Sequence, residues 1–223
     1  MSIKKYLLDQ LKSGFPLDAT ITLSEVYALN PLITESVIRE MMGRLVKEGS
    51  LLKVKAGVFQ FAKEDNLFNG DQIDFYSAID TLYLWDRSKS RIGYRSGINF
   101  ANMLGLTTQT ASVDTIISNA VSNKRREIKI SNICVRLNAP RTTITDANYR
   151  LLQILDLLTD FNGLSEYTIE QAKSILIEYL RNIRLSDEEI DAITTKYPLK
   201  TQLIFAKSGI QLAISTMRKK ETF

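Results

Sequence analysis

Between Thr22 and Phe61 the spacing of hydrophobic and polar residues changes from a helical period to the alternation of a hairpin. Thr22 and Glu25 have the spacing of a capping box, which predicts a short helix over residues 23–29. Asn30-Pro31 follows, and proline both lacks an amide donor and disfavours helical geometry at the preceding residue. The pattern therefore predicts a turn between this helix and the next.

A second helix is expected over residues 35–48, with Thr34 as its N-cap and Gly49 after its end. Six apolar side chains at helical spacing form its inner face: Val37, Ile38, Met41, Met42, Leu45 and Val46. Residues 51–55 and 58–61 then predict a β-hairpin that turns at Ala56-Gly57. The order of elements is typical of a winged helix-turn-helix.

This motif favours binding of double-stranded DNA, with the second helix in a groove and the hairpin beside it. The expected DNA-binding residues are Thr34, Ser36, Arg39, Arg44, Lys47, Lys53 and Lys55. Two observations leave an alternative open. Similar small domains also serve as protein-interaction modules, and the acids of the second helix cancel its basic residues.

Composition narrows the chemistry. The chain has 223 residues, 44% of them hydrophobic and 24% charged, which is ordinary for one or two globular domains. It contains a single cysteine, Cys134, and no histidine. The missing histidine excludes Ser-His-Asp and Cys-His catalysis and histidine-ligated zinc. Together with the absence of a long apolar stretch, these features predict a cytoplasmic protein without a membrane partner, cofactor or metal.

Charge is distributed unevenly along the chain. Residues 1–62 carry a net charge of +2, residues 63–80 carry −4, residues 81–150 carry +7, and residues 151–223 carry −1. The acidic stretch after residue 62 marks a junction. The sequence therefore predicts a DNA-binding domain over 1–64 and a second domain over 71–223.

The second domain begins with a helix over 73–85 and another that Ser96 caps and Gly105 ends. Runs at 113–117, 124–130 and 133–137 then predict a small antiparallel sheet over about 113–138. A basic surface that binds a partner is expected at Arg91, Arg95, Lys124, Arg125, Arg126 and Lys129. A merely solvated face would give the same charge run.

Four helices are expected to pack over this sheet, within residues 145–220. They cover residues 148–160, a segment capped by Thr168, a segment opened by the capping box of Ser186 and Glu189, and residues 201–219. The fold class is therefore α+β, with a winged helix-turn-helix, a mixed domain and a helical tail.

The segments GRLVKEGSLLKVKAGVFQF, GYRSGINFANMLGLTTQTASVDTIISNA and RREIKISNICVRLNAP resemble AbiEi-type antitoxins, which are transcriptional regulators of type IV toxin–antitoxin systems. The resemblance covers roughly Thr22 to Pro140. It implies an autorepressor that binds promoter DNA and also counteracts a nucleotidyltransferase-type toxin in abortive infection, a form of phage defence. The basic surface would then meet the toxin or its RNA target.

Two other classes of function remain. The chain could be a transcription regulator whose second domain binds an effector or a protein, without a toxin. A nucleic-acid enzyme would have to use carboxylates such as Asp71, Asp74, Asp80 and Asp86, but their spacing matches no recognised metal site. We therefore expect a binding protein without catalytic residues.

Overall fold

The computed structural model describes residues 2–62, 73–122, 125–130 and 133–221. In this part of the chain the fold is α+β, and the chain forms two compact units, Met1–Thr81 and Leu82–Phe223. The acidic junction expected after residue 62 lies largely outside the described residues. The two units divide later, within a helix.

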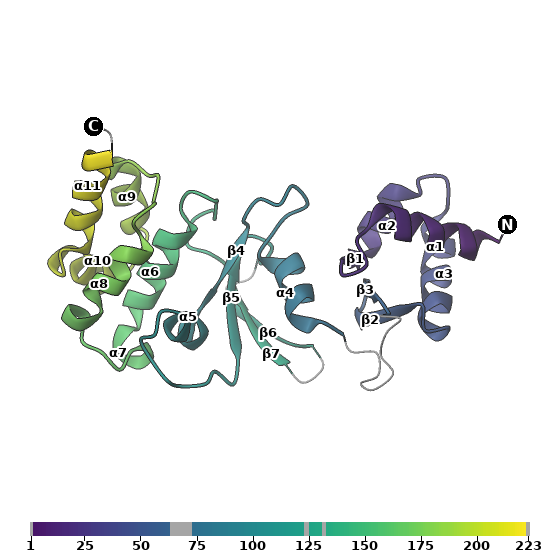
Figure 1. Ribbon diagram of the computed structural model, residues 1–223, viewed down its shortest axis with the longest axis horizontal. Helices are drawn as coiled ribbons and strands as arrows, with labels where there is room; N and C mark the ends of the chain where they lie inside the picture. Colours follow the sequence, from purple (N-terminus) through teal and green to yellow (C-terminus); the bar gives the residue numbers. More distant parts are fainter. Residues whose placement is uncertain (1, 63–72, 123–124, 131–132, 222–223) are drawn as a thin grey trace. The chain divides into compact units, whose positions relative to one another are not determined.

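The N-terminal unit contains three complete helices, a short strand after the first of them and a hairpin after the third, and it ends within a further helix, α4 (Phe75–Tyr83) (Figure 1). The elements are α1 (Ile3–Gly14), β1 (Thr20–Thr22), α2 (Leu23–Leu29), α3 (Glu35–Lys47), β2 (Leu51–Lys55) and β3 (Val58–Phe61). The three strands are antiparallel in the order β1-β3-β2. The sheet thus joins the hairpin to the strand that precedes α2.

Local chemistry fixes the ends of these elements. The Thr22 amide donates to the Glu25 carboxylate at 2.8 Å, and the Glu25 amide donates to the Thr22 hydroxyl, which completes the predicted capping box. Gly49 and Gly57 both have positive φ, at 74° and 73°, as a helix C-terminus and a tight turn require. Thr34 occupies the N-cap of α3 but makes no side-chain cap hydrogen bond.

The core of this unit lies where α1 and α3 meet the sheet. Leu7 and Leu11 of α1 are fully buried, as are Ile38 and Met42 of α3. Since these side chains recur at helical spacing, each helix buries one face and leaves the other exposed. The outward face of α3 is therefore available to a ligand.

The C-terminal unit is built on a four-stranded sheet in the order β4-β5-β7-β6. Its strands are β4 (Gly93–Ser96), β5 (Asp114–Ser118), β6 (Arg125–Ile130) and β7 (Ile133–Asn138). The predicted purely antiparallel sheet is wrong, because β5 and β7 pair in parallel. The hairpin of β6 and β7 places β7 against β5 and leaves β6 at the edge. Strand β4 was also not predicted.

Gly93 explains how β4 packs. A Cβ atom there would lie 2.0 Å from the Tyr83 carbonyl oxygen and 2.9 Å from that of Ile117. The first atom belongs to the end of α4 (Phe75–Tyr83), and the second belongs to β5. Only glycine permits this close approach.

The segment that carries the family resemblance has a clear structural role. After α5 (Gly97–Met103), Gly105 adopts a φ of 70°, and Thr107 and Thr108 follow. The Glu166 carboxylate accepts hydrogen bonds from both threonine hydroxyls, each at 2.9 Å, and from the Thr108 amide at 2.8 Å. These threonines therefore fasten the α5 segment to the helical region.

The helices of that region stack to one side of the sheet (Figure 1). They are α6 (Tyr149–Thr159), α7 (Phe161–Leu164), α8 (Ile169–Tyr179), α9 (Asp187–Thr194), α10 (Leu199–Lys207) and α11 (Ile210–Glu221). Helix α6 is buried almost all round, as expected of a central helix. The single helix predicted over 201–219 is wrong, since Gly209 breaks it with a φ of 73°.

Candidate functional site

The predicted DNA-binding residues of α3 and its N-cap form one exposed surface. Thr34, Ser36, Arg39, Arg44 and Lys47 are all exposed, while the apolar side chains of α3 turn inward. The Thr34 and Ser36 hydroxyls lie 3.3 Å apart at the start of the helix. The sequence therefore correctly predicted that these side chains are exposed.

Arg39 is held in position by two neighbours. Its Nε donates to the Tyr27 hydroxyl of α2 at 2.7 Å, and its Nη2 donates to the Glu35 carboxylate at 2.8 Å. The guanidinium also lies 5.7 Å from the centre of the Tyr27 ring. Tyr27 was not among the predicted site residues, because only the packing of α2 on α3 brings it to Arg39.

Carboxylates partly neutralise the basic residues of this surface. Arg44 pairs with Glu40 at 2.6 Å on α3, and Lys4 of α1 pairs with Glu48 at 2.6 Å. Both members of the Arg39–Glu35 and Arg44–Glu40 pairs remain more than half exposed, at 60% and 57% of their side-chain surface. Exposed pairs of this kind contribute only about 0.3 to 0.5 kcal/mol each. A stronger anion can therefore displace them.

The hairpin adds one clearly exposed cation. Lys53 of β2 is exposed, whereas Lys55, next to the Ala56-Gly57 turn, is half-buried. A Cβ added at Gly57 would lie in ordinary van der Waals contact with Leu23, 3.5 Å from its methyl, and the Leu23 amide donates to the Gly57 carbonyl at 2.9 Å. The hairpin is thus packed against the start of α2.

The six residues predicted as one partner-binding surface do not gather in one place. Arg95 pairs with the buried carboxylate of Asp114 at 3.3 Å, and the Asn99 amide donates to the same carboxylate at 2.7 Å. Arg91 instead lies over two rings, 4.0 Å from the centre of Trp85 and 4.2 Å from that of Tyr149. Both arginines are therefore engaged within the fold.

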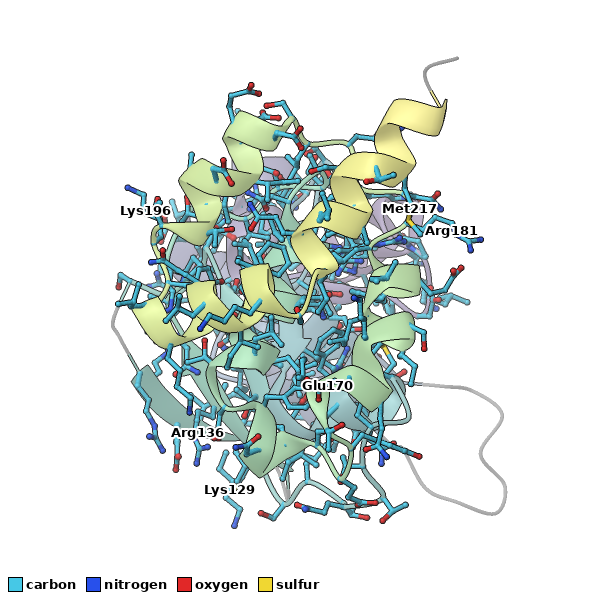
Figure 2. The ribbon with its side chains drawn as sticks, turned by 90° about the vertical axis from the view of Figure 1, so that its left-hand side faces the viewer. Lys129, Arg136, Glu170, Arg181, Lys196 and Met217 are labelled. Atoms are coloured by element: carbon cyan, nitrogen blue, oxygen red, sulfur yellow. The ribbon has the colours of Figure 1, made fainter. Side chains whose placement is uncertain are left out.

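The remaining predicted cations lie on the edge strand β6. Arg125, Arg126 and Lys129 are exposed, and Lys124 lies outside the described residues. Glu127 accepts from Arg125 at 3.3 Å and from Arg136 of the neighbouring strand at 3.0 Å, and these arginines lower the pKa of its carboxyl. Figure 2 shows Lys129 and Arg136 at the same edge of the unit. This edge carries a mixed charge pattern rather than a continuous basic patch.

Sequence reasoning missed a polar cluster between the sheet and the helices, in which Tyr94 and Tyr197 are buried, Asp156 is half-buried and Arg141 is exposed. The Tyr94 hydroxyl donates to the Asp156 carboxylate at 2.5 Å, and the Arg141 guanidinium lies 5.1 Å from the centre of the Tyr197 ring. Burial raises the pKa of Asp156 to about 6, although the Tyr94 hydroxyl and Arg141 act against this. Burial likewise raises the pKa of both tyrosines. No local spacing reveals this cluster, because its members come from four separate segments.

A groove of about 470 Å³ runs between α8 and α10. Its floor is apolar, with Ile169, Leu199 and Leu203, and Lys200 and Lys207 stand beside it. Leu199 and Leu203 are exposed large hydrophobic residues. Glu170, labelled in Figure 2, lines the groove from the start of α8.

Two of the four carboxylates considered as metal ligands, Asp74 and Asp86, accept hydrogen bonds from backbone amides near them in sequence. Asp74 accepts from the Ser77 amide at 2.9 Å at the start of α4, and Asp86 accepts from the Ser88 and Ser90 amides in a turn. Asp71 lies outside the described residues. Across the described ranges, no group of three or more His, Cys, Asp or Glu side chains is arranged to hold a metal ion. In the same ranges, no helix is long and apolar enough to cross a membrane.

No protein-family model matches the sequence, and no curated protein matches it either. The geometry of α3, the hairpin and the C-terminal unit therefore carries the functional argument.

Proposed function

We propose that the N-terminal unit is a winged helix-turn-helix that binds promoter DNA. The observation that carries the proposal is the order α1-β1-α2-α3-β2-β3 with the sheet β1-β3-β2, which leaves one face of α3 exposed beside a hairpin. In this interpretation α3 enters the major groove, which admits an α-helix, and β2 and β3 form the wing beside it.

The ion pairs on α3 are compatible with this role. Releasing Arg39 from Glu35 costs about 0.3 to 0.5 kcal/mol, whereas a bidentate contact from arginine to guanine contributes about 1 to 3 kcal/mol. The hydrogen bond from Arg39 to Tyr27 limits the rotamers of the arginine before DNA arrives. Arg39 is thus an exposed and partly ordered guanidinium near the centre of the helix.

The first experiment is a gel shift of the full chain on its own promoter over a salt series. We expect affinity to fall steeply with salt, because each phosphate contact releases counterions. Lys53→Ala should weaken binding to operator and random duplexes alike. A complete absence of shift at low salt, or a shift that salt does not affect, would refute DNA binding through this surface.

The second experiment separates base recognition from phosphate contacts. Arg39→Ala should lower the ratio of operator to random-duplex affinity, which corresponds to a loss of about 1 to 3 kcal/mol in the free energy of discrimination. Arg181→Ala is the matched control, since Arg181 is also an exposed arginine that pairs with a carboxylate close in sequence, Glu178 of α8. An unchanged ratio for Arg39→Ala would mean that α3 does not read bases.

For the C-terminal unit, we propose that it counteracts a nucleotidyltransferase-type toxin, so that the chain acts as antitoxin and autorepressor in the cytoplasm. The resemblance to AbiEi-type antitoxins supports this half of the proposal. Rescue of growth on co-expression with the toxin of the neighbouring gene is the test. If Arg125 and Lys129 of β6 contribute, Arg125→Glu with Lys129→Glu should abolish rescue, while promoter repression and the thermal melt stay unchanged.

The groove between α8 and α10 favours a second candidate, a regulator whose C-terminal unit binds an effector or a protein. An apolar floor with charged residues at its rim is typical of such sites. Leu203→Lys would block the groove at an exposed position. Loss of promoter regulation in this variant, for a wild-type chain that gives no rescue from the product of the neighbouring gene, would favour the second candidate.

A further inference from the structure

Trp85 in the C-terminal unit is an exposed aromatic residue that contacts an arginine, and the proposed function assigns no role to it. Trp85 is the only tryptophan of the chain, and 36% of its surface is exposed. The Arg91 guanidinium lies over its ring at 4.0 Å and over the Tyr149 ring at 4.2 Å. Arg150 lies next, 5.8 Å from the centre of Tyr149 and 5.5 Å from that of Tyr179. We call these five residues the aromatic–guanidinium cluster.

The turn that follows Trp85 is held firmly. Trp85 and Arg91 form an isolated antiparallel bridge, and between them the Asp86 carboxylate accepts from the Ser88 amide at 2.8 Å and the Ser90 amide at 2.9 Å. The Asp86 amide in turn donates to the Ser90 carbonyl at 2.9 Å. This turn places Arg87 and Lys89 in exposed positions within four residues of the indole.

The stretch of sequence that supplies most of the cluster is rich in basic residues. Residues 81–150 contain eleven basic and four acidic side chains. Asp114 pairs with Arg95, and Glu127 pairs with Arg125 and Arg136. Asp86 is engaged in its own turn, and Asp146 accepts from the Arg91 amide at 3.2 Å. Arg87 and Lys89, the two exposed cations nearest to Trp85 in the sequence, favour an anionic ligand at this turn.

We propose that Trp85 and the turn of residues 86–90 bind single-stranded nucleic acid. A base stacks on the exposed part of the indole, and the phosphates beside it meet Arg87 and Lys89. Arg91 lies over the indole and Tyr149 supports Arg91, so the ring is oriented before the ligand arrives.

An exposed indole beside two cations favours single-stranded nucleic acid over other anionic ligands. An acidic peptide would meet the cations but gains little from an indole, whereas every base offers a flat π-face. Bases within a duplex are stacked on one another and do not present that face, so the strand must be single. The site is separate from α3 and does not depend on DNA binding there or on a toxin.

The lone tryptophan makes the test direct, because its fluorescence reports on this site alone. Full-length protein is titrated with oligo(U), oligo(A) and oligo(dT) of about 12 nucleotides, within the site sizes known for such surfaces. Saturable quenching that weakens with salt is expected for at least one of them. The RNA and DNA oligomers show which sugar is preferred. No quenching by any oligomer at low salt would overturn the proposal.

Variants are then compared by the anisotropy of a labelled oligomer. Trp85→Ala should lower the affinity about 5- to 100-fold, and Trp85→Phe, which keeps a ring, should lower it less. Lys89→Asn should reduce the salt dependence of binding, because it removes a cation that contacts phosphate. Asparagine is chosen because it tolerates the φ of 62° at this position. Tyr167→Ala is the matched control at another exposed aromatic residue and should bind like wild type.

The remaining outcomes decide the question. Each variant is checked by a thermal melt, and wild-type binding by a folded Trp85→Ala variant would overturn the site. Quenching by polyglutamate equal to that by the oligomers would show recognition of charge alone and would also overturn it. Duplex binding to the promoter should persist in Trp85→Ala, so failure of this site is distinguishable from failure of the proposed function. Loss of quenching in Arg39→Ala with Lys53→Ala would assign the binding to the N-terminal unit instead.

Discussion

On α3 each arginine meets a carboxylate of the same helix at the surface, whereas in the C-terminal unit Arg91, Arg95 and Arg150 meet aromatic rings or a buried carboxylate. The side chain of Asp114 is only 4% exposed, and those of Glu35 and Glu40 are 60% and 57% exposed. Burial makes an ion pair costly to break, while exposure leaves it weak. The surface pairs suit exchange with a ligand, and the buried pair holds the fold.

The largest expected effect comes from the close approach at β4. Gly93→Ala should destabilise the C-terminal unit by more than about 4 kcal/mol, because its Cβ would lie 2.0 Å from the Tyr83 carbonyl oxygen. Trp85 fluorescence follows the unfolding of this unit alone. Gly43→Ala on α3, followed by far-ultraviolet circular dichroism, is the control for a glycine with open space around a Cβ and should cause no loss of stability. A wild-type melting curve for Gly93→Ala would contradict the packing described for β4.

The second largest effect on stability is expected from breaking the buried ion pair of Arg95 and Asp114. Arg95→Met should destabilise the protein by about 2 to 4 kcal/mol, because it leaves the buried Asp114 carboxylate with Asn99 but without its cation. Arg39→Met should change stability by less than about 0.5 kcal/mol. Denaturant titrations of both variants measure the difference. Equal losses of stability would show that the buried Arg95–Asp114 pair is no more important to the fold than the exposed Arg39–Glu35 pair.

Asp156 predicts a dependence of the stability of the C-terminal unit on pH. Its pKa is raised to about 6 from an ordinary 3.8, so the folded state binds a proton more tightly than the unfolded chain. The stability contributed by this group is complete below about pH 4 and falls as the pH rises towards 6, by about 1 to 3 kcal/mol. Denaturant melts across this range should show the slope in wild type.

Asp156→Asn should flatten that slope and be the more stable form at neutral pH, since the amide oxygen still accepts from Tyr94. Asp18→Asn, at an exposed aspartate of the N-terminal unit, should keep the slope. A wild-type slope in Asp156→Asn would assign the pH dependence to another group.

The sequence correctly predicted the features that depend only on residues close together in the chain. Capping boxes at Thr22 and Ser186 and the positive φ at Gly49 follow from residues within one turn of each other, and these helix ends were confirmed. Strand β4 was missed because GYRS is short and begins with glycine. The parallel pairing of β5 with β7 was missed because it depends on where the β6–β7 hairpin docks.

The same limit applies to the candidate sites. The exposed face of α3 follows from the spacing of residues on one helix, so the sequence correctly predicted that Arg39 and Arg44 are exposed. The contact between Trp85, Arg91 and Tyr149 joins segments about sixty residues apart, and so does the Tyr94–Asp156 hydrogen bond. Charge alone suggested a single basic surface, and the fold distributes those charges among aromatic rings, a buried acid and an edge strand.

The smallest expected effect comes from adding a methyl group to the exposed face of α3 without changing its charge. Gly43 lies in the middle of α3, is exposed, and has open space around the position of a Cβ. Gly43→Ala should therefore stabilise the N-terminal unit by about 0.5 to 1 kcal/mol, because alanine restricts the unfolded chain and favours helix. If α3 enters a groove with this face, the added methyl should leave the duplex affinity unchanged or lower it, despite the more stable helix. Far-ultraviolet circular dichroism melts and the promoter gel shift measure the two quantities on one variant. Higher stability with a proportionate gain in affinity would indicate that helix order limits binding, and that this face of α3 makes no close contact with DNA.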